Sequence, residues 1–414
     1  MHQCAFKKLV FIKKNTSMKK IDIKQLKQLI STKVLENIDL TDIDLNSIID
    51  FSSCVLKNVL FSKKQGKLKL ISNINFNNAK LTNVQFDNSV LLNVDFTNAL
   101  VKKCSFQIDD KVLESIIQKD DKIIKPTIAK VTFAKSKIDR CRFRNSIIDW
   151  SDFRYAEITN TTFENSRINF CDFYRTHFHK INIFKKALIS NSSLNYTLFE
   201  GTIIRKENIV SGTILQENRE NYRIFLVEWK ERGPGIRRTD ANEMWEPKKL
   251  EKELNEMHGH AENIYKNLNG NWISNGFFSD ANWAYVKAKR KERERLKNNL
   301  IEADDLKQKL KIRSKISGNY FCDITFGYGE SISKIIRTYV ALIIIFGLII
   351  HFLESNNSIF DSFIKSLLNM VAQTNSTIDY IPFEITILNI VQSSIGIILT
   401  GIFGFIIANR IRHQ

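Results

Sequence analysis

Bulky apolar residues recur at every fifth position over much of the amino-terminal half of this chain. The run from Phe76 to Phe106 has one at each step, and the same spacing returns between Phe133 and Ile183. Two residues before each of them stands a smaller or branched residue. A period of five matches neither the 3.6-residue turn of an α-helix nor the alternation of a strand. The pattern therefore predicts a chain that turns a corner every five residues and stacks coil upon coil.

The repeat has two interruptions and one change of register. Residues 62–72 and 107–130 break the period, and we expect both to be excursions from the stack. After Ile183, preceded at the small position by Ile181, the register slips by one residue and continues to Ile204. Four of the six cysteines stand at small inward positions, where we expect them to act as small apolar core residues: Cys54, Cys104, Cys141 and Cys171.

This run resembles the pentapeptide-repeat family. The resemblance implies a right-handed quadrilateral β-helix over residues 36–206, following an amino-terminal segment of residues 1–35. At four repeats per coil, it implies about six coils. Some members of the family act as acidic DNA mimics, but the net charge here is +18 and the exposed repeat positions carry many lysines and arginines. We therefore expect a solvated face or a protein or ligand partner on the solenoid, and no nucleic-acid partner.

Composition excludes several other classes of protein. The 414 residues are 43% hydrophobic and 26% charged, with 29 phenylalanines, which excludes a disordered chain. The scattered cysteines indicate neither a zinc site nor a disulfide framework. His258 and His260 stand two residues apart on a predicted helix and point to different faces, so we expect no metal site and no cofactor. No nucleophile and base can be placed together, so we expect no enzyme.

Two strongly apolar windows lie near the carboxyl end. Residues 385–408 carry no formal charge, and as a helix they would be about 36 Å long, enough to cross a hydrocarbon core of about 30 Å. Residues 335–353 form the second window. The alternative for each is a buried core helix. Basic side chains flank both windows on their outer sides, which places both termini in the cytoplasm of a multi-pass inner-membrane protein.

Residues 207–330, between the repeat and the first window, predict a basic helical linker. An amphipathic helix is expected over 248–268, ended by Asn269-Gly270, and Ser279-Asp280 is expected to cap the next helix. Residues 279–285 and 326–330 look like the linker of bacterial proteins that join pentapeptide repeats to a two-helix ion channel. Gly327-Tyr328-Gly329 spells a potassium-channel signature, but it precedes the first window and cannot line a pore between the two spans.

The last part of the chain, residues 331–414, resembles the two-transmembrane potassium-channel family. Residues 359–382 are too short to cross a membrane and too apolar for a free loop, so we expect a re-entrant pore helix followed by a polar return. The resemblance places the selectivity filter at six residues, Thr374, Asn375, Ser376, Thr377, Ile378 and Asp379. Ser376 and Ile378 stand where the family has glycine, and a β-branched residue is strained in that backbone conformation.

The sequence therefore predicts an all-α, two-transmembrane pore domain behind the β-helix and its α-helical linker. One hairpin cannot enclose a conduit, so we expect a homotetramer that conducts a monovalent cation without strict potassium selectivity. Glycines of the second span are candidates for a gating hinge or for close helix packing: Gly396, Gly401 and Gly404. The alternative is a non-conducting scaffold, anchored in the lipid bilayer, whose solenoid binds a protein.

Overall fold

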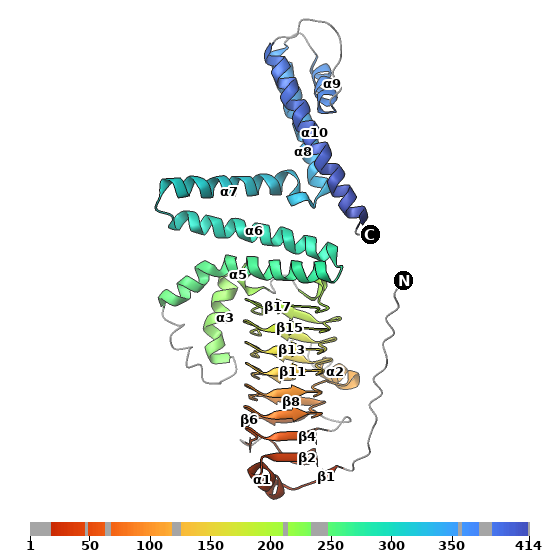
Figure 1. Ribbon diagram of the computed structural model, residues 1–414, viewed down its shortest axis with the longest axis vertical. Helices are drawn as coiled ribbons and strands as arrows, with labels where there is room; N and C mark the ends of the chain where they lie inside the picture. Colours follow the sequence, from red (N-terminus) through yellow and green to blue (C-terminus); the bar gives the residue numbers. More distant parts are fainter. Residues whose placement is uncertain are drawn as a thin grey trace. The chain divides into compact units, whose positions relative to one another are not determined.

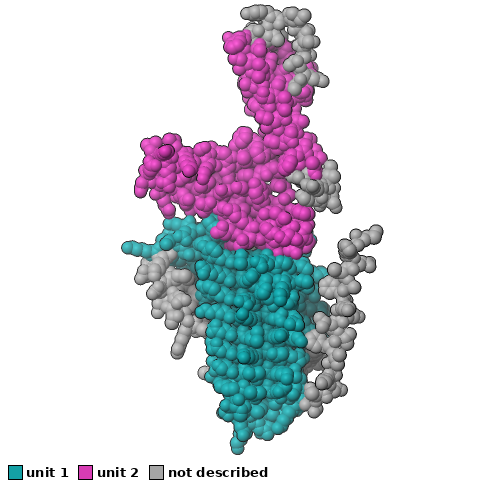
Figure 2. Space-filling view, in the orientation of Figure 1, with its two compact units in different colours: residues 1–260 teal, residues 261–414 magenta. Residues whose placement is uncertain are grey.

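The computed structural model describes residues 18–45, 49–62, 68–117, 126–209, 214–232, 247–354, 358–371 and 383–412. The chain divides into two units, residues 1–260 and residues 261–414 (Figure 2). The long helix α5 (Pro247–Ser274) contributes residues to both.

The first unit is a β-solenoid in which short parallel strands stack turn upon turn (Figure 1). Helix α1 (Ile23–Ser31), with a capping box at Asp22, precedes the stack. Nine strands of one sheet are recorded in the described residues: β1 (Lys19–Lys20), β2 (Val34–Asp39), β4 (Val55–Leu60), β7 (Lys80–Thr82), β9 (Leu100–Lys102), β11 (Lys137–Asp139), β13 (Glu157–Thr159), β15 (His177–His179) and β17 (Leu198–Phe199).

A second sheet and several single bridges complete the turns. Its six recorded strands are β5 (Lys69–Ser72), β8 (Ser89–Leu92), β10 (Ile128–Ala129), β12 (Ile147–Asp149), β14 (Arg167–Asn169) and β16 (Leu188–Ser190), and a further pair is β3 (Ile49–Asp50) with β6 (Ile74–Asn75). All these pairings are parallel, and most join residues about one turn apart, as in Leu81 with Val101. The backbone hydrogen bonds of each turn are therefore made to its neighbours.

The sequence prediction of the inward positions is confirmed over most of the repeat. Phe76, Phe86 and Phe96 are at most 1% exposed, and so is the smaller residue two positions before each of them. Polar residues at the small position are buried as well, with Ser146 at 0% and Ser89 at 3% exposed. The rings form stacks along the solenoid, with centroids 4.9 Å apart for Phe96 and Phe133. Burial of such rings is the main apolar contribution of each turn.

Corners are made by residues with positive φ. They stand two positions after most of the bulky inward residues, as Asn78 (φ 58°) follows Phe76 and Lys103 (φ 56°) follows Val101. Asparagine is frequent there because its short polar side chain tolerates the left-handed conformation. The corner at position 201 is a glycine.

The solenoid has about eight turns over its described part, where the sequence predicted about six. Two reasons account for the difference. The stack already includes β2, whose Leu35 is fully buried, and the interruptions are shorter than expected. Residues 69–72 pair with β8, and β10 pairs with both β8 and β12. Between these strands the second interruption includes helix α2 (Asp110–Ile117).

One predicted register is wrong. Ile181 is 57% exposed and Ile183 is only partly buried, whereas Asn182 and Phe184 are fully buried. The slip of one residue therefore follows Phe178 and not Ile183. Asn182 can occupy an inward position because its amide is satisfied: Nδ2 donates to the carbonyls of Ile158 and His179, and Oδ1 accepts from the amide of Thr161.

Helix α3 (Arg219–Arg232) follows the solenoid, after the short 3₁₀ turns η1 (Lys206–Asn208) and η2 (Leu215–Glu217). A separate apolar cluster in the first unit joins solenoid, α3 and the start of α5: Trp150, Leu215, Tyr222, Phe225, Trp229, Leu254 and Met257. Trp150 stacks on Phe170 one turn away, at 4.6 Å. The aromatic surface of the solenoid is covered there by helices of its own unit.

The second unit is helical. It contains the end of α5, α6 (Phe278–Glu302), α7 (Leu306–Thr325), the turn η3 (Gly327–Gly329), α8 (Ile332–Leu353), α9 (Ile359–Met370) and α10 (Phe383–Arg412). The buried face predicted for α5 is confirmed, since Leu254, Ile264 and Leu268 are at most 1% exposed.

Two predicted helix boundaries in this unit are wrong. Helix α5 continues through Asn269-Gly270 to Ser274, because Trp272 is fully buried and the Asn269 side chain donates to the carbonyl of Ala281. Gly276, with φ 76°, ends the segment instead. Helix α6 begins at Phe278, and its preceding residue makes no side-chain cap, so Ser279 lies inside the helix.

Candidate functional site

Helices α8 and α10 present large apolar faces. Residues Ile332–Leu353 and Phe383–Ala408 are long and apolar enough to cross a membrane, and only 22% of each apolar window is buried within the chain. Val340, Ile345 and Phe352 on α8 are each at least half exposed, as are Ile390 and Ile398 on α10. Apolar faces of this size are costly in water and suit a lipid environment.

The short helix α9 comes between α8 and α10 in the chain and packs against both at one side of the pair (Figure 1). Its 12 residues are too few to cross a hydrocarbon core. Ser358 accepts a bond from the amide of Asp361 at its start and so caps the helix. The connection between the two apolar helices therefore contains an ordered helix at the start of residues 359–382, where the sequence predicted one. The re-entrant placement of that helix stays a prediction.

Buried polar side chains join α9 to its neighbours. Gln392 of α10 is fully buried, and its Nε2 donates to the Ser366 carbonyl at 2.9 Å and to the Ser366 hydroxyl at 2.6 Å. That hydroxyl donates in turn to the carbonyl of Ile343 on α8, at 2.9 Å. One chain of hydrogen bonds thus crosses all three helices. We define Ser366, Asn369 and Gln392 as the α9 polar cluster.

The carboxyl end of α9 is held in the same way. Asn369 donates to Oδ1 of Asn389 at 2.7 Å, and Ser393 donates to the Asn369 carbonyl at 2.9 Å. From α8, the Tyr339 hydroxyl donates to the carbonyl of Met370 at 2.9 Å. In an apolar environment these bonds satisfy groups that would otherwise be costly to bury, and so they fix the end of α9 against both helices.

Glycines permit this close packing. At Gly396 an added Cβ would collide with the carbonyl of Met370, and at Gly347 it would collide with the ring of Phe363. Gly401 and Gly404 differ, because within the described residues nothing would lie within 4 Å of a Cβ there. Among the three glycines that the sequence singled out, Gly396 thus lies at a helix contact, and a hinge role for any of them stays a prediction.

The six predicted filter residues, 374–379, lie outside the described residues. So do the remaining residues of the predicted polar return, up to 382. The described structure reaches Val371 on one side and Phe383 on the other. The role of Asp379 at a pore mouth therefore stays a prediction.

A buried charge cluster joins α6, α7 and the start of α8. The Asp323 carboxylate of α7 accepts hydrogen bonds from Nε and Nη2 of Arg290, both at 3.1 Å. It also accepts hydrogen bonds from Nη1 of Arg293 at 3.2 Å and from Nζ of Lys334 at 2.7 Å. Burial alone would raise the pKa of Asp323, but the hydrogen bonds and charges of Arg290 and Lys334 outweigh it and hold that pKa at about 2. The carboxylate therefore stays ionised and ties the linker helices to α8.

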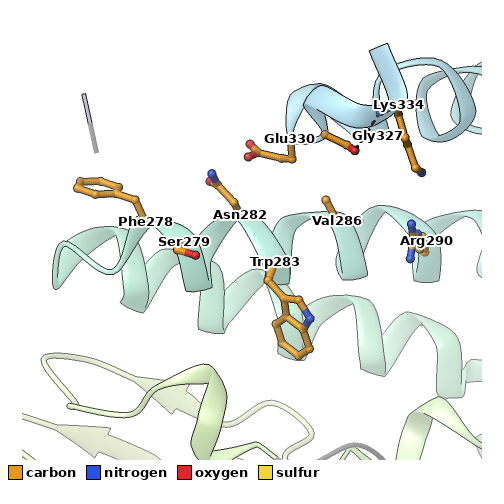
Figure 3. Close-up of a pocket in the computed structure, with 10 residues that line it drawn as sticks. Phe278, Ser279, Asn282, Trp283, Val286, Arg290, Gly327, Glu330 and Lys334 are labelled. Carbon is orange, nitrogen blue, oxygen red and sulfur yellow. Dashed lines mark hydrogen bonds between the residues drawn. The ribbon is translucent and has the colours of Figure 1, made fainter. Parts of the chain in front are cut away.

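Beside this cluster is a pocket of about 530 Å³, wholly within the second unit (Figure 3). One wall is α6, with Phe278, Ser279, Asn282, Trp283, Val286 and Arg290. The other is the turn before α8 and the first turn of that helix, with Gly327, Glu330, Ser331 and Lys334. The two segments that resemble the channel linker in sequence thus meet around one cavity. Gly327-Tyr328-Gly329 forms the tight turn between α7 and α8, with positive φ at all three residues.

Sequence reasoning missed the α9 polar cluster and the Asp323 cluster. A signal for the first was present, since Gln392 is a large polar residue in the middle of an uncharged apolar window. Such residues usually face a partner helix and not lipid. For Asp323 there was no comparable signal, because its partners lie 33, 30 and 11 residues away and the segment is rich in basic residues throughout.

The comparisons with known proteins concern the solenoid. Residues 71–107 match the family of pentapeptide repeats, in eight copies. This match and the stacked turns show a pentapeptide-repeat domain with a β-solenoid fold, as the sequence predicted. No curated protein matches the chain in sequence.

Solved structures that resemble the chain are also pentapeptide-repeat proteins. HetL, involved in heterocyst differentiation regulation in the cyanobacterium Nostoc sp. strain PCC 7120, is 9% identical over 46% of this chain and 94% of its own, with a TM-score of 0.19. A trypsin-treated form of QnrB1, a plasmid-mediated fluoroquinolone resistance protein, is 13% identical over 47% and 87%, with a TM-score of 0.18. Rfr23 from Cyanothece 51142 is 12% identical over 45% and 97%, with a TM-score of 0.12.

Proposed function

We propose that this chain, a pentapeptide-repeat β-solenoid followed by two apolar helices, forms an oligomeric cation channel of a bacterial inner membrane. The observation that carries the proposal is α9, a helix too short to span, held against both long helices by buried hydrogen bonds. A simple membrane anchor needs no such helix. A re-entrant pore helix needs this support, because its backbone ends at membrane depth.

The conduit itself belongs to an assembly. Two spans and one short helix cannot enclose water, so four copies around α10 are proposed, with residues 374–379 as the selectivity region. Polar side chains at 374–377 and a ring of Asp379 carboxylates would favour cations over anions. The absence of glycine at positions 376 and 378 argues against a strict potassium filter. A right-handed, four-sided cross-section of the solenoid and cytoplasmic termini belong to the same proposal.

The Asp323 cluster supplies a route from the linker to the span. Lys334 stands in the first turn of α8 and donates to both the carboxylate and the carbonyl of Asp323. A shift of α6 and α7 would therefore be transmitted to α8 through the ion pair between Asp323 and Lys334. We propose that a protein or ligand bound to the solenoid acts through this linker.

The test is recording from the purified full chain in planar bilayers. We expect the detergent-solubilised protein to have four times the mass of the 48.1 kDa chain. We also expect currents carried by sodium and by potassium, with similar permeabilities for the two ions. Asp379→Asn should lower cation over anion selectivity several-fold. Asp361→Asn, which changes an exposed carboxylate at the start of α9, is the matched control and should leave selectivity unchanged. A monomeric mass with no current from inserted protein would favour the anchored scaffold and refute the channel.

A further inference from the structure

A set of metal-type donors lies on the part of α5 that belongs to the first unit. Glu253, Glu256 and His260 occupy successive turns of one helix face, three and four residues apart. Nε2 of His260 lies 3.4 Å from Oε1 of Glu253 and 3.9 Å from Oε2 of Glu256. One oxygen from each carboxylate and the imidazole nitrogen all lie within 4.8 Å of one another.

The imidazole is the second observation. The His260 side chain is 8% exposed, and the edge of the Tyr196 ring packs against it, with centroids 5.6 Å apart. Its Nε2 is buried without a hydrogen-bond partner among the residues that the structure describes. A buried polar nitrogen of this kind requires an explanation, and here the atom points at two carboxylates.

The spacing of the donors fits a small ion. Bonds of about 2.0–2.1 Å to a tetrahedral ion put two ligand atoms about 3.3 Å apart. The nitrogen-to-oxygen distances at Glu253 and Glu256 need only small side-chain adjustments to reach that value. The exposed side of Glu256, 52% accessible, gives the ion a path from solvent.

One of the carboxylates is already oriented by a neighbour. The buried hydroxyl of Tyr222, on α3, donates to Oε1 of Glu253 at 2.6 Å. A hydrogen bond to a ligating carboxylate is the usual support of a metal site, and its loss weakens metal binding about 10- to 100-fold. Donors from one helix are thus held in place by a side chain from another.

We infer that Glu253, Glu256 and His260 bind one divalent transition-metal ion of the zinc class, with water completing its coordination. A donor set of one imidazole and two carboxylates suits Zn²⁺ and Co²⁺ better than it suits Ca²⁺, because calcium is bound by oxygen ligands only. Sequence reasoning did not predict this site, because it considered His258 and His260 as a pair, and these two residues cannot ligate one ion together. The ligands that His260 needs stand four and seven residues before it.

The experiment uses the full chain, purified without a histidine tag in detergent, stripped with chelator and titrated with Co²⁺. A visible d–d absorption that saturates at one equivalent and is displaced by Zn²⁺ is expected. His260→Gln and Glu256→Gln should each weaken Co²⁺ binding at least tenfold, and Tyr222→Phe by about tenfold. His258→Gln, a histidine on the same helix, is the matched control and should bind as the wild type does.

Glu256→Gln keeps the test decisive, because an exposed glutamine is compatible with the fold even where a change at buried His260 is not. Circular dichroism of each variant establishes that it is folded. Absence of the absorption in the folded wild type would overturn the inference. Equal Co²⁺ binding by the wild type and a folded Glu256→Gln variant would also overturn it, since the ion would then lie elsewhere.

Discussion

The solenoid and the α8–α9–α10 bundle are stabilised by opposite means. In the solenoid each turn repeats the same contacts, with phenylalanine rings stacked at intervals such as 5.0 Å between Phe133 and Phe153. In the bundle the contacts occur once, and the buried groups between helices include Ser366 and Gln392. A solenoid turn depends only on its neighbours, whereas each polar contact of the bundle has no substitute.

The largest expected effect tests the repeat. Phe133→Ala removes a fully buried ring that stacks on one neighbour at 4.9 Å and on another at 5.0 Å, so it should destabilise the surrounding turns by about 3–5 kcal/mol. Hydrogen exchange of amides in β11 and β13 measures the loss. Amides of α8 should exchange as before, because the damage is confined to neighbouring turns.

The control for that substitution is Leu100→Ala, on the same stack. Leu100 is 37% exposed, so its truncation should change local stability by less than about 1 kcal/mol. Equal losses for the two variants would contradict the view that inward rings carry the stability of a turn.

The second prediction concerns the charge cluster of the second unit. Asp323 has its pKa lowered from an ordinary 3.8 to about 2, so its contribution to stability is present above pH of about 4 and is lost as the pH falls through about 2. Asp323→Asn should therefore destabilise the second unit by about 2 kcal/mol at neutral pH. The gap between variant and wild type should close between about pH 4 and pH 2.

Denaturant titration of the detergent-solubilised chain at several pH values measures this gap. Asp304→Asn is the control, because Asp304 is exposed at the turn between α6 and α7. A gap that persists unchanged at the lowest pH would show that the loss comes from packing and not from the charge.

Sequence reasoning succeeded where a local rule repeats and failed where a single contact overrides it. The positions of Phe76 and Phe96 followed from a period of five, because each turn imposes the same burial. The early slip at Asn182 could not be predicted, because an asparagine is acceptable inward only when distant carbonyls satisfy its amide. Likewise α5 passes through Gly270 because burial of Trp272 outweighs the local preference for a stop.

The same reasoning applies to the candidate site. Two strongly apolar windows predicted α8 and α10, and a short apolar stretch predicted α9. The partners of Ser366 could not be predicted, since they depend on how three helices pack. The Asp323 cluster was hidden because a basic linker offers many equivalent partners for one acid.

The third prediction tests the bundle. Gln392→Leu keeps the apolar volume but removes the donor to Ser366, so the contact of α9 with α10 should lose about 1 kcal/mol. Hydrogen exchange of α9 amides in detergent reports the loss. Ser394→Ala is the matched control, because the Ser394 hydroxyl bonds within α10, to the Ile390 carbonyl. Faster exchange in both variants would contradict a specific role for the α9 polar cluster.

The smallest expected effect returns to the solenoid and tests whether its corners tolerate improvement. Lys103 occupies a corner with φ 56°, a conformation that costs a long side chain more than it costs asparagine, the residue at the preceding corner, Asn98. Lys103→Asn should therefore stabilise its turn by about 0.5 kcal/mol. The amide of residue 103, which donates to the Asp139 carbonyl at 2.8 Å, should then exchange roughly twofold more slowly.

The control for Lys103→Asn is Lys102→Asn, which changes a strand residue of β9 and should give no gain in stability. A gain at position 102 equal to that at 103 would show that the effect comes from removing a positive charge and not from the corner conformation.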